Sequence, residues 1–126
     1  MKSREALIRL KRFQVEDKRR QVAQIEAMIA EFDRMAKELN DQVLAEQERS
    51  GIHDAGHFAY PTFAKAATQR RDNLAASERA LKEQLSAAKS AYETALEELQ
   101  KAEAIAERDM LQANAAATHK AEARAS

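Results

Sequence analysis

Three side chains near the middle of the chain are of types that bind metal ions. His53, Asp54 and His57 lie within five residues, and two histidines four apart can share one face of a helix. A zinc site needs further ligands, yet the chain has no cysteine and only one other histidine, His119. Two histidines in a glycine-containing segment are more typical of a solvated loop. We therefore expect no metal site and no cofactor.

The residue patterns that mark common catalytic sites do not occur in the sequence. It has no Gly-rich phosphate loop, no Gly-x-Ser-x-Gly turn and no Ser/His/Asp arrangement. Its many glutamates recur at helical spacing, which indicates solvated helix faces rather than general acids. The absence of cysteine excludes disulfides and thiolate chemistry, and agrees with a reducing compartment. We expect that the protein is not an enzyme.

Basic residues gather at the start of the chain although the formal net charge is zero. Residues 1–20 hold eight Lys or Arg against three Asp or Glu, whereas residues 90–109 hold six acidic residues against two basic ones. A basic strip can bind phosphates, but no aromatic side chains accompany this one for base stacking. We expect no nucleic-acid partner, and expect the strip to face the acidic segment. The basic strip comprises Arg9, Lys11, Arg12, Lys18, Arg19 and Arg20.

Three aromatic residues, Phe58, Tyr60 and Phe63, lie close together after the histidines. They either cover the end of a hydrophobic core or form a patch that binds a partner, a role that aromatic residues favour. The sequence leaves both interpretations open.

The elements that position these residues are two long helices. Both glycines and the one proline fall between residues 51 and 61, and Ala, Leu, Glu, Lys, Arg and Gln dominate the rest. We expect a helix over about 2–48, a connection over 49–60 and a helix over about 61–112, together forming one hairpin over 1–112. The Ala-rich tail, 113–126, has almost no large apolar residue, and we expect it to be frayed or disordered.

Seven-residue apolar periodicity runs through both predicted helices, which indicates a coiled coil. The fold class expected is therefore all-α, a long two-helix antiparallel coiled-coil hairpin. If the chain folds back about residue 55, the layers are Ile8/Ala102, Val15/Ala95, Val22/Ala88, Ile29/Leu81, Ala36/Leu74 and Val43/Ala67. Large residues then meet small ones, which keeps the layers even in volume. Phe32 opposite Glu78 and Leu39 opposite Arg71 fit poorly, so we expect the half near the connection to be looser.

The location expected from the sequence is the cytoplasm. No apolar run approaches the roughly 18 residues that cross a bilayer, and the basic first residues include no signal-like apolar stretch.

Two segments carry a resemblance to a known family. They read MKSREALIRLKRF from Met1 and HFAYPTFAKAATQRRDNL from His57. Over about residues 1–110 the chain resembles the FliJ family of flagellar export proteins, and it looks most like the alphaproteobacterial branch.

The resemblance implies a non-catalytic rod of the flagellar type III protein export apparatus. Such proteins are expected to contact the export ATPase ring, to engage the cytoplasmic domain of the export gate protein and to escort substrate chaperones. The basic strip would face the ATPase, and the rod would reach the membrane at the basal body only through partners.

The resemblance also suggests which residues would meet the gate. The family's gate-contacting face begins with an aromatic residue early in the second helix, and Phe63 matches that position. Ala67, Arg70 and Leu74 occupy the following positions. The alternative that the sequence leaves open is a generic coiled-coil adaptor or holdase-like chaperone unrelated to flagella.

Overall fold

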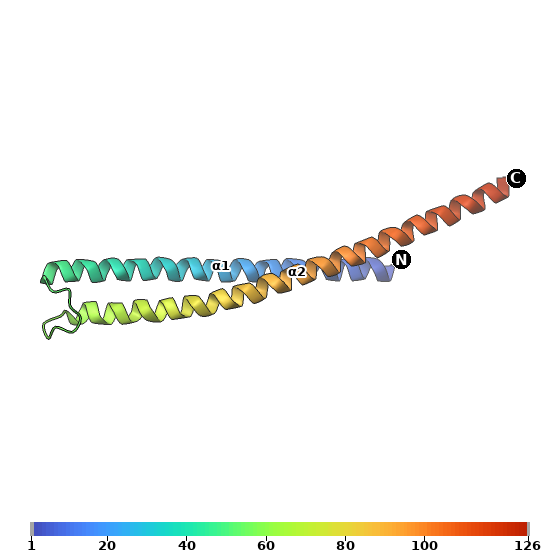
Figure 1. Cartoon of the computed structure of the whole chain (residues 1–126). Coiled ribbons are helices and arrows are strands. Elements are labelled where there is room, and N and C mark those ends of the chain that lie inside the picture. Colours follow the sequence, from blue (N-terminus) through green and yellow to red (C-terminus); the bar gives the residue numbers. More distant parts are fainter. Residues whose placement is uncertain (1, 126) are drawn as a thin grey trace. The chain divides into compact units, whose positions relative to one another are not determined.

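The computed structural model describes residues 2–125 and is an all-α helical hairpin. Helix α1 spans Lys2–Ser50 and helix α2 spans Thr62–Ala125. The two helices pack against each other, and residues 51–61 connect them (Figure 1). The fold class predicted from the heptad pattern is confirmed.

Helix α1 ends where the sequence first supplies a glycine. Gly51 has φ +74°, a left-handed conformation that costs glycine nothing and that commonly terminates helices. Its N–H donates to the carbonyl oxygen of Gln47 at 2.8 Å. The Ser50 hydroxyl donates to that same carbonyl oxygen at 3.2 Å. The last turn is therefore capped, which explains why the helix stops two residues later than predicted.

Helix α2 begins directly after Pro61. The carbonyl oxygen of Pro61 accepts a hydrogen bond from the Lys65 N–H at 3.1 Å, the first bond of the helical ladder. Proline suits this place because its fixed φ is helical and the first N–H groups of a helix have no partner within it.

The hairpin divides into two compact units, and each is described by itself. Unit 1 comprises Met1–Gln21 with Ala88–Ser126, and unit 2 comprises Val22–Ala87. Each contains a seam, by which we mean the line of inward-facing residues between α1 and α2.

The seam of unit 1 contains the predicted layer of Val15 and Ala95, both of which are buried. One turn away, Lys11 Nζ lies 3.0 Å from Glu98 Oε2. This interhelical ion pair is consistent with the register predicted from the heptads.

The seam of unit 2 is the better covered of the two. Val43, Ala64, Ala67 and Leu81 are all buried there. One turn from Val43 and Ala67, Arg71 Nη1 donates to Asn40 Oδ1 at 2.7 Å. The predicted layer of Val43 with Ala67 is therefore consistent with the observed register.

The expectation of a looser half near the connection is wrong. The polar seam residues Glu78 and Arg71 are accommodated because each has a polar partner. Glu78 lies 3.7 Å from Lys82 Nζ, while Arg71 reaches Asn40 as described above.

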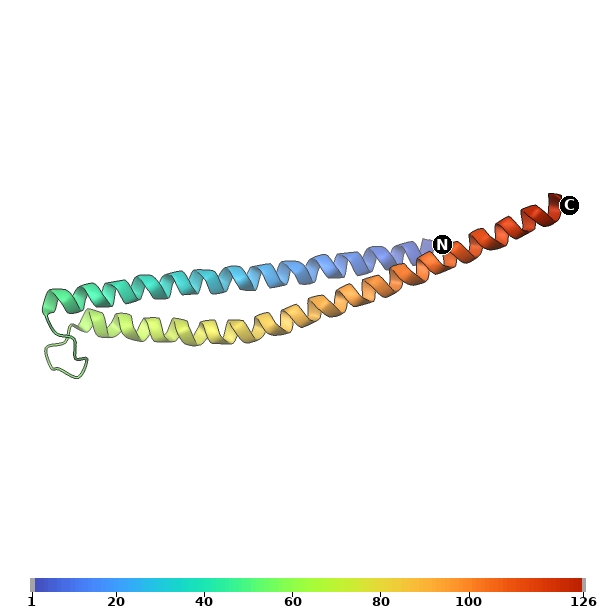
Figure 2. The same ribbon diagram turned by 45° about the horizontal axis from the view of Figure 1, so that its top comes forward.

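The expectation of a frayed or disordered tail is also wrong for the residues described. Helix α2 does not end near residue 112 but continues to Ala125, and Figures 1 and 2 show it passing the start of α1. Every residue from Met110 to Ala125 is exposed, so packing does not explain the helix. Alanine has the highest intrinsic helix propensity, and no glycine or proline interrupts this stretch. Ser126 lies outside the described residues.

Candidate interaction surfaces

The three aromatic residues near the connection have different environments. Phe58 is 97% exposed and Phe63 is 55% exposed. Tyr60 is half-buried, and its hydroxyl accepts a hydrogen bond from Gln47 Nε2 at 3.0 Å. Tyr60 thus ties the connection to the end of α1, whereas Phe58 and Phe63 are available to a partner. Tyr60 fits the interpretation in which an aromatic residue covers the end of the core, whereas the exposure of Phe58 and Phe63 fits the interpretation of a partner-binding patch.

A shallow groove of about 280 Å³ lies beyond Phe63 on unit 2. Arg70 and Leu74 line it, and Arg70 is exposed while Leu74 is half-buried. Its other lining residues are Met35, Leu39, Asn73 and Ser77. Ala67 is buried in the seam, which removes it from any partner surface. Phe63 and Arg70 are seven residues apart on α2, so they point to the same side of the helix.

The basic strip lies in unit 1, and the structure separates its members into paired and unpaired groups. Lys11 contacts Glu98, and Arg12 Nη2 lies 3.8 Å from Glu103 Oε2. Arg19 pairs with Glu16 of its own helix, and the hydrogen bond that Arg19 donates to the Glu16 carboxylate raises the pKa of Arg19. The predicted pairing of the basic strip with the acidic segment is therefore confirmed for two members.

The other members of the basic strip have no ion pair within residues 2–125. Arg9 and Arg20 are exposed, and Lys18 is half-buried beside a groove of about 460 Å³. Sequence reasoning also missed the interhelical ion pair of Arg4 with Asp109. This ion pair could have been predicted, because Arg4 and Asp109 have opposite charges and the predicted register places them close together.

The residues considered as metal ligands do not assemble into a site. Asp54 Oδ1 accepts the Gly56 N–H at 2.9 Å, and His57 Nδ1 accepts the Ala59 N–H at 3.0 Å. These local bonds shape the connection. Among residues 2–125 no group of three potential ligands is close enough to hold a metal ion.

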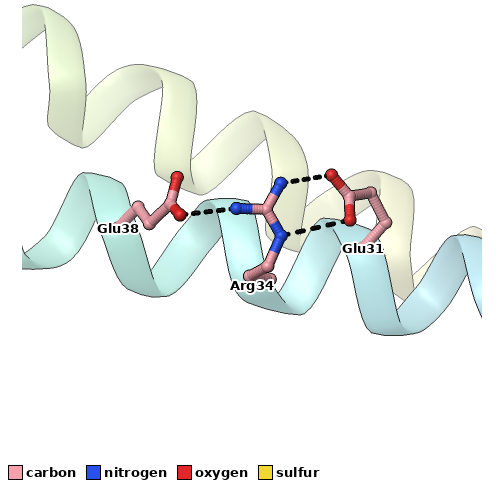
Figure 3. Close-up of polar contacts among 3 residues, drawn as sticks. All are labelled: Glu31, Arg34 and Glu38. Atoms are coloured by element: carbon pink, nitrogen blue, oxygen red, sulfur yellow. Dashed lines mark hydrogen bonds and ion pairs between the residues drawn. The ribbon is translucent and has the colours of Figure 1, made fainter.

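An exposed charged cluster on α1 is the most perturbed electrostatic feature among the residues described (Figure 3). Arg34 Nε donates to Glu31 Oε2 at 3.1 Å, and its other nitrogens contact Glu31 and Glu38. The hydrogen bond between Arg34 and Glu31 raises the pKa of Arg34 and lowers the pKa of Glu31. All three side chains are exposed, and such pairs at three- and four-residue spacing mainly support the helix.

Exposed apolar side chains in unit 1 form a second surface that sequence reasoning missed. Leu7, Leu10 and Phe13 of α1 are exposed, as is Ile105 of α2. They lie outside the two heptad series, so counting core positions passes over them. The spacing of three residues from Leu7 to Phe13 was the available signal, because such residues share one side of a helix.

The helices of residues 2–125 include none that is long and apolar enough to cross a membrane. Comparisons of the chain with protein-family models, curated proteins and solved structures found no match.

Proposed function

We propose that this chain is a non-catalytic, rod-shaped component of the flagellar type III protein export apparatus. In this role it couples the export ATPase ring to the cytoplasmic domain of the export gate protein and escorts substrate chaperones. Its place is the cytoplasmic face of the flagellar basal body, where it meets the membrane only through partners.

The proposal rests on one observation: exposed apolar side chains lie within a segment that resembles the FliJ family. The segment that resembles the FliJ family includes Phe58 and Phe63, and both have large exposed areas. Monomeric proteins seldom expose apolar clusters that have no binding role. Phe63, Arg70 and Leu74 form the proposed gate-binding surface, with Phe58 at its edge.

The basic strip supports the ATPase-facing part of the proposal. Three of its members, Arg9, Lys18 and Arg20, have no ion pair within residues 2–125, so their charges are available to acidic groups on another protein. Charges of this kind speed association and set orientation more than they add affinity.

A generic adaptor or holdase-like chaperone is the second candidate function. The exposed phenylalanines favour it equally, because they would bind apolar client segments as readily as a gate protein. The two functions differ in specificity: the adaptor binds many clients, whereas the export component binds the ATPase and the gate domain.

A deletion strain tests the proposal in the source bacterium. We expect cells that lack the gene to lose most swimming motility and most flagellin export, and the intact gene on a plasmid to restore both. A Phe63→Ala gene should restore them poorly, and a Leu44→Ala gene should restore them fully, because Leu44 is an exposed residue outside the proposed surface. Normal swimming of the deletion strain would refute the proposal.

A further inference from the structure

The groove in unit 1 shows which residues lie along the same edge of the seam. Gln14 and Asp17 of α1 line it together with Thr94 and Glu98 of α2. Positions seven residues apart in a coiled coil lie on the same side of their helix. Leu7 and Leu10 lie seven residues before Gln14 and Asp17, and Ile105 lies seven after Glu98. These three apolar residues therefore continue the same edge.

We call this surface the apolar edge and define it by Leu7, Leu10, Phe13 and Ile105. Phe13 belongs to it because its side chain lines the same groove. Leu10 is 51% exposed and Phe13 is 63% exposed. Residues 7 to 18 of α1 span about 17 Å, or roughly three helical turns.

The opposite edge of unit 1 differs from the apolar edge in its ion pairs between the helices. Arg4 with Asp109 and Arg12 with Glu103 form ion pairs between the helices there. The apolar edge carries one interhelical ion pair among residues 2–125, Lys11 with Glu98, and its apolar side chains remain exposed.

Unpaired basic residues flank the apolar edge. Lys101 and Arg108 lie seven and fourteen residues after Thr94, which places them along the edge on α2. Arg9 lies four residues before Phe13, on the same side of α1 as that residue. None of these three has an ion pair within residues 2–125.

The acidic residues of the same edge already have partners inside the chain. Glu98 contacts Lys11 Nζ. Asp17 Oδ2 accepts a hydrogen bond from Gln21 Nε2 at 3.1 Å. The unpaired charges of Lys101 and Arg108 lie beside the apolar strip, and the complement of such a surface is an apolar strip beside negative charges.

We propose that the apolar edge of unit 1 binds an acidic amphipathic helix of another protein. That helix presents apolar residues at spacings of three and four toward Leu7, Leu10 and Phe13, and directs its Asp or Glu side chains to Arg9, Lys101 and Arg108. It lies along the groove of about 460 Å³. Docking of an amphipathic helix into an apolar groove is a common mode of recognition. The inference rests on the proposed function only in taking the chain to be an interaction protein.

The test uses the full chain and a designed helical peptide of roughly 20 residues, with Leu at helical spacing flanked by Glu. Fluorescence anisotropy measures its affinity at low and high salt. Two control peptides replace every Glu by Lys, or every Leu by Ser. We expect the acidic peptide to bind, both controls to bind at least about tenfold more weakly, and added salt to weaken binding.

Variants of the chain locate the binding surface. We expect Leu10→Gln combined with Phe13→Gln to weaken acidic-peptide binding at least about tenfold, and Arg9→Glu to weaken it about fivefold. The matched controls are Met28→Gln combined with Leu44→Gln, which are exposed apolar residues of unit 2, and Arg79→Glu. These should leave affinity within about twofold, because surface substitutions outside an interface have little effect. All of the substituted residues are exposed, and far-UV circular dichroism verifies that every variant keeps its helicity.

Three results would overturn the inference. The first is equal binding of the acidic and basic peptides, and the second is unchanged binding by the Leu10 and Phe13 variant. The third is that the acidic peptide does not bind and the apolar edge has another occupant. That occupant would be a membrane if the same variant abolishes cosedimentation with vesicles of equal phosphatidylglycerol and phosphatidylcholine. It would be a second copy of the chain if the variant abolishes self-association in sedimentation equilibrium. Failure of the proposed function is separate: the peptide would bind as expected while the export ATPase and the gate domain would not.

Discussion

Val43 and Leu44 are neighbours in α1 with opposite environments, so they test the seam directly. Val43 is 4% exposed, whereas Leu44 is 54% exposed. Val43→Ala removes two buried carbon groups at about 0.8 kcal/mol each, and the remaining cavity adds to this, for a loss of about 1.5 to 2.5 kcal/mol of unfolding free energy. Leu44→Ala removes a larger side chain, yet we expect a change within about 0.5 kcal/mol because the site is solvated and alanine is a strong helix former.

Urea unfolding followed by far-UV circular dichroism measures both values. The midpoint should fall for Val43→Ala with an unchanged slope, which indicates lost stability rather than a changed denatured state. The reasoning would be refuted if Leu44→Ala destabilised the protein as much as Val43→Ala, since the register of the seam would then be different.

Two further predictions address the register and the charged cluster on α1. Because the chain has no native cysteine, Val15→Cys combined with Ala95→Cys should form a disulfide under mild oxidation, whereas Val15→Cys combined with Ala102→Cys should not. A mobility shift on non-reducing gels detects the disulfide. A disulfide in the second variant and none in the first would contradict the register. The bond from Arg34 lowers the pKa of Glu31 below its ordinary value of 4.5, so its stabilisation is present above pH 4.5 and is lost as the pH falls through the folded-state pKa. The melting temperature of the native chain should therefore slightly exceed that of Glu31→Gln at pH 7, and this difference should shrink as the pH falls below 4.5. A difference that stays constant as the pH falls would contradict this.

Heptad spacing predicted the fold because it reports packing directly. Val15, Val43, Ala67, Leu81 and Ala95 were all predicted in the seam, and all are buried. The break after residue 50 was also predictable, since only glycine adopts the observed backbone conformation without strain.

The errors came from treating apolar content as the only source of order. The tail is helical because of alanine propensity, which does not depend on a partner helix. The polar seam residues Arg71 and Glu78 do not loosen unit 2, because Arg71 bonds to Asn40 and Glu78 lies close to Lys82. Sequence alone does not show those contacts.

The candidate surfaces were predicted only in part. Phe58 and Phe63 were identified, but residue type did not show that Tyr60 bonds to Gln47 and belongs to the fold. The apolar edge was missed because Leu7, Leu10 and Phe13 stand outside the heptad core. Their exposure becomes visible only when the partner helix is in place.

Binding of the purified chain to the flagellar export ATPase and to the cytoplasmic domain of the export gate, measured by isothermal titration calorimetry, tests the central claim most directly. We expect both proteins to bind, and Phe63→Ala to weaken gate binding at least about fivefold while ATPase binding and far-UV helicity stay unchanged. Binding to neither protein would contradict the proposed function. Lost helicity with unchanged gate binding would instead assign Phe63 to the fold.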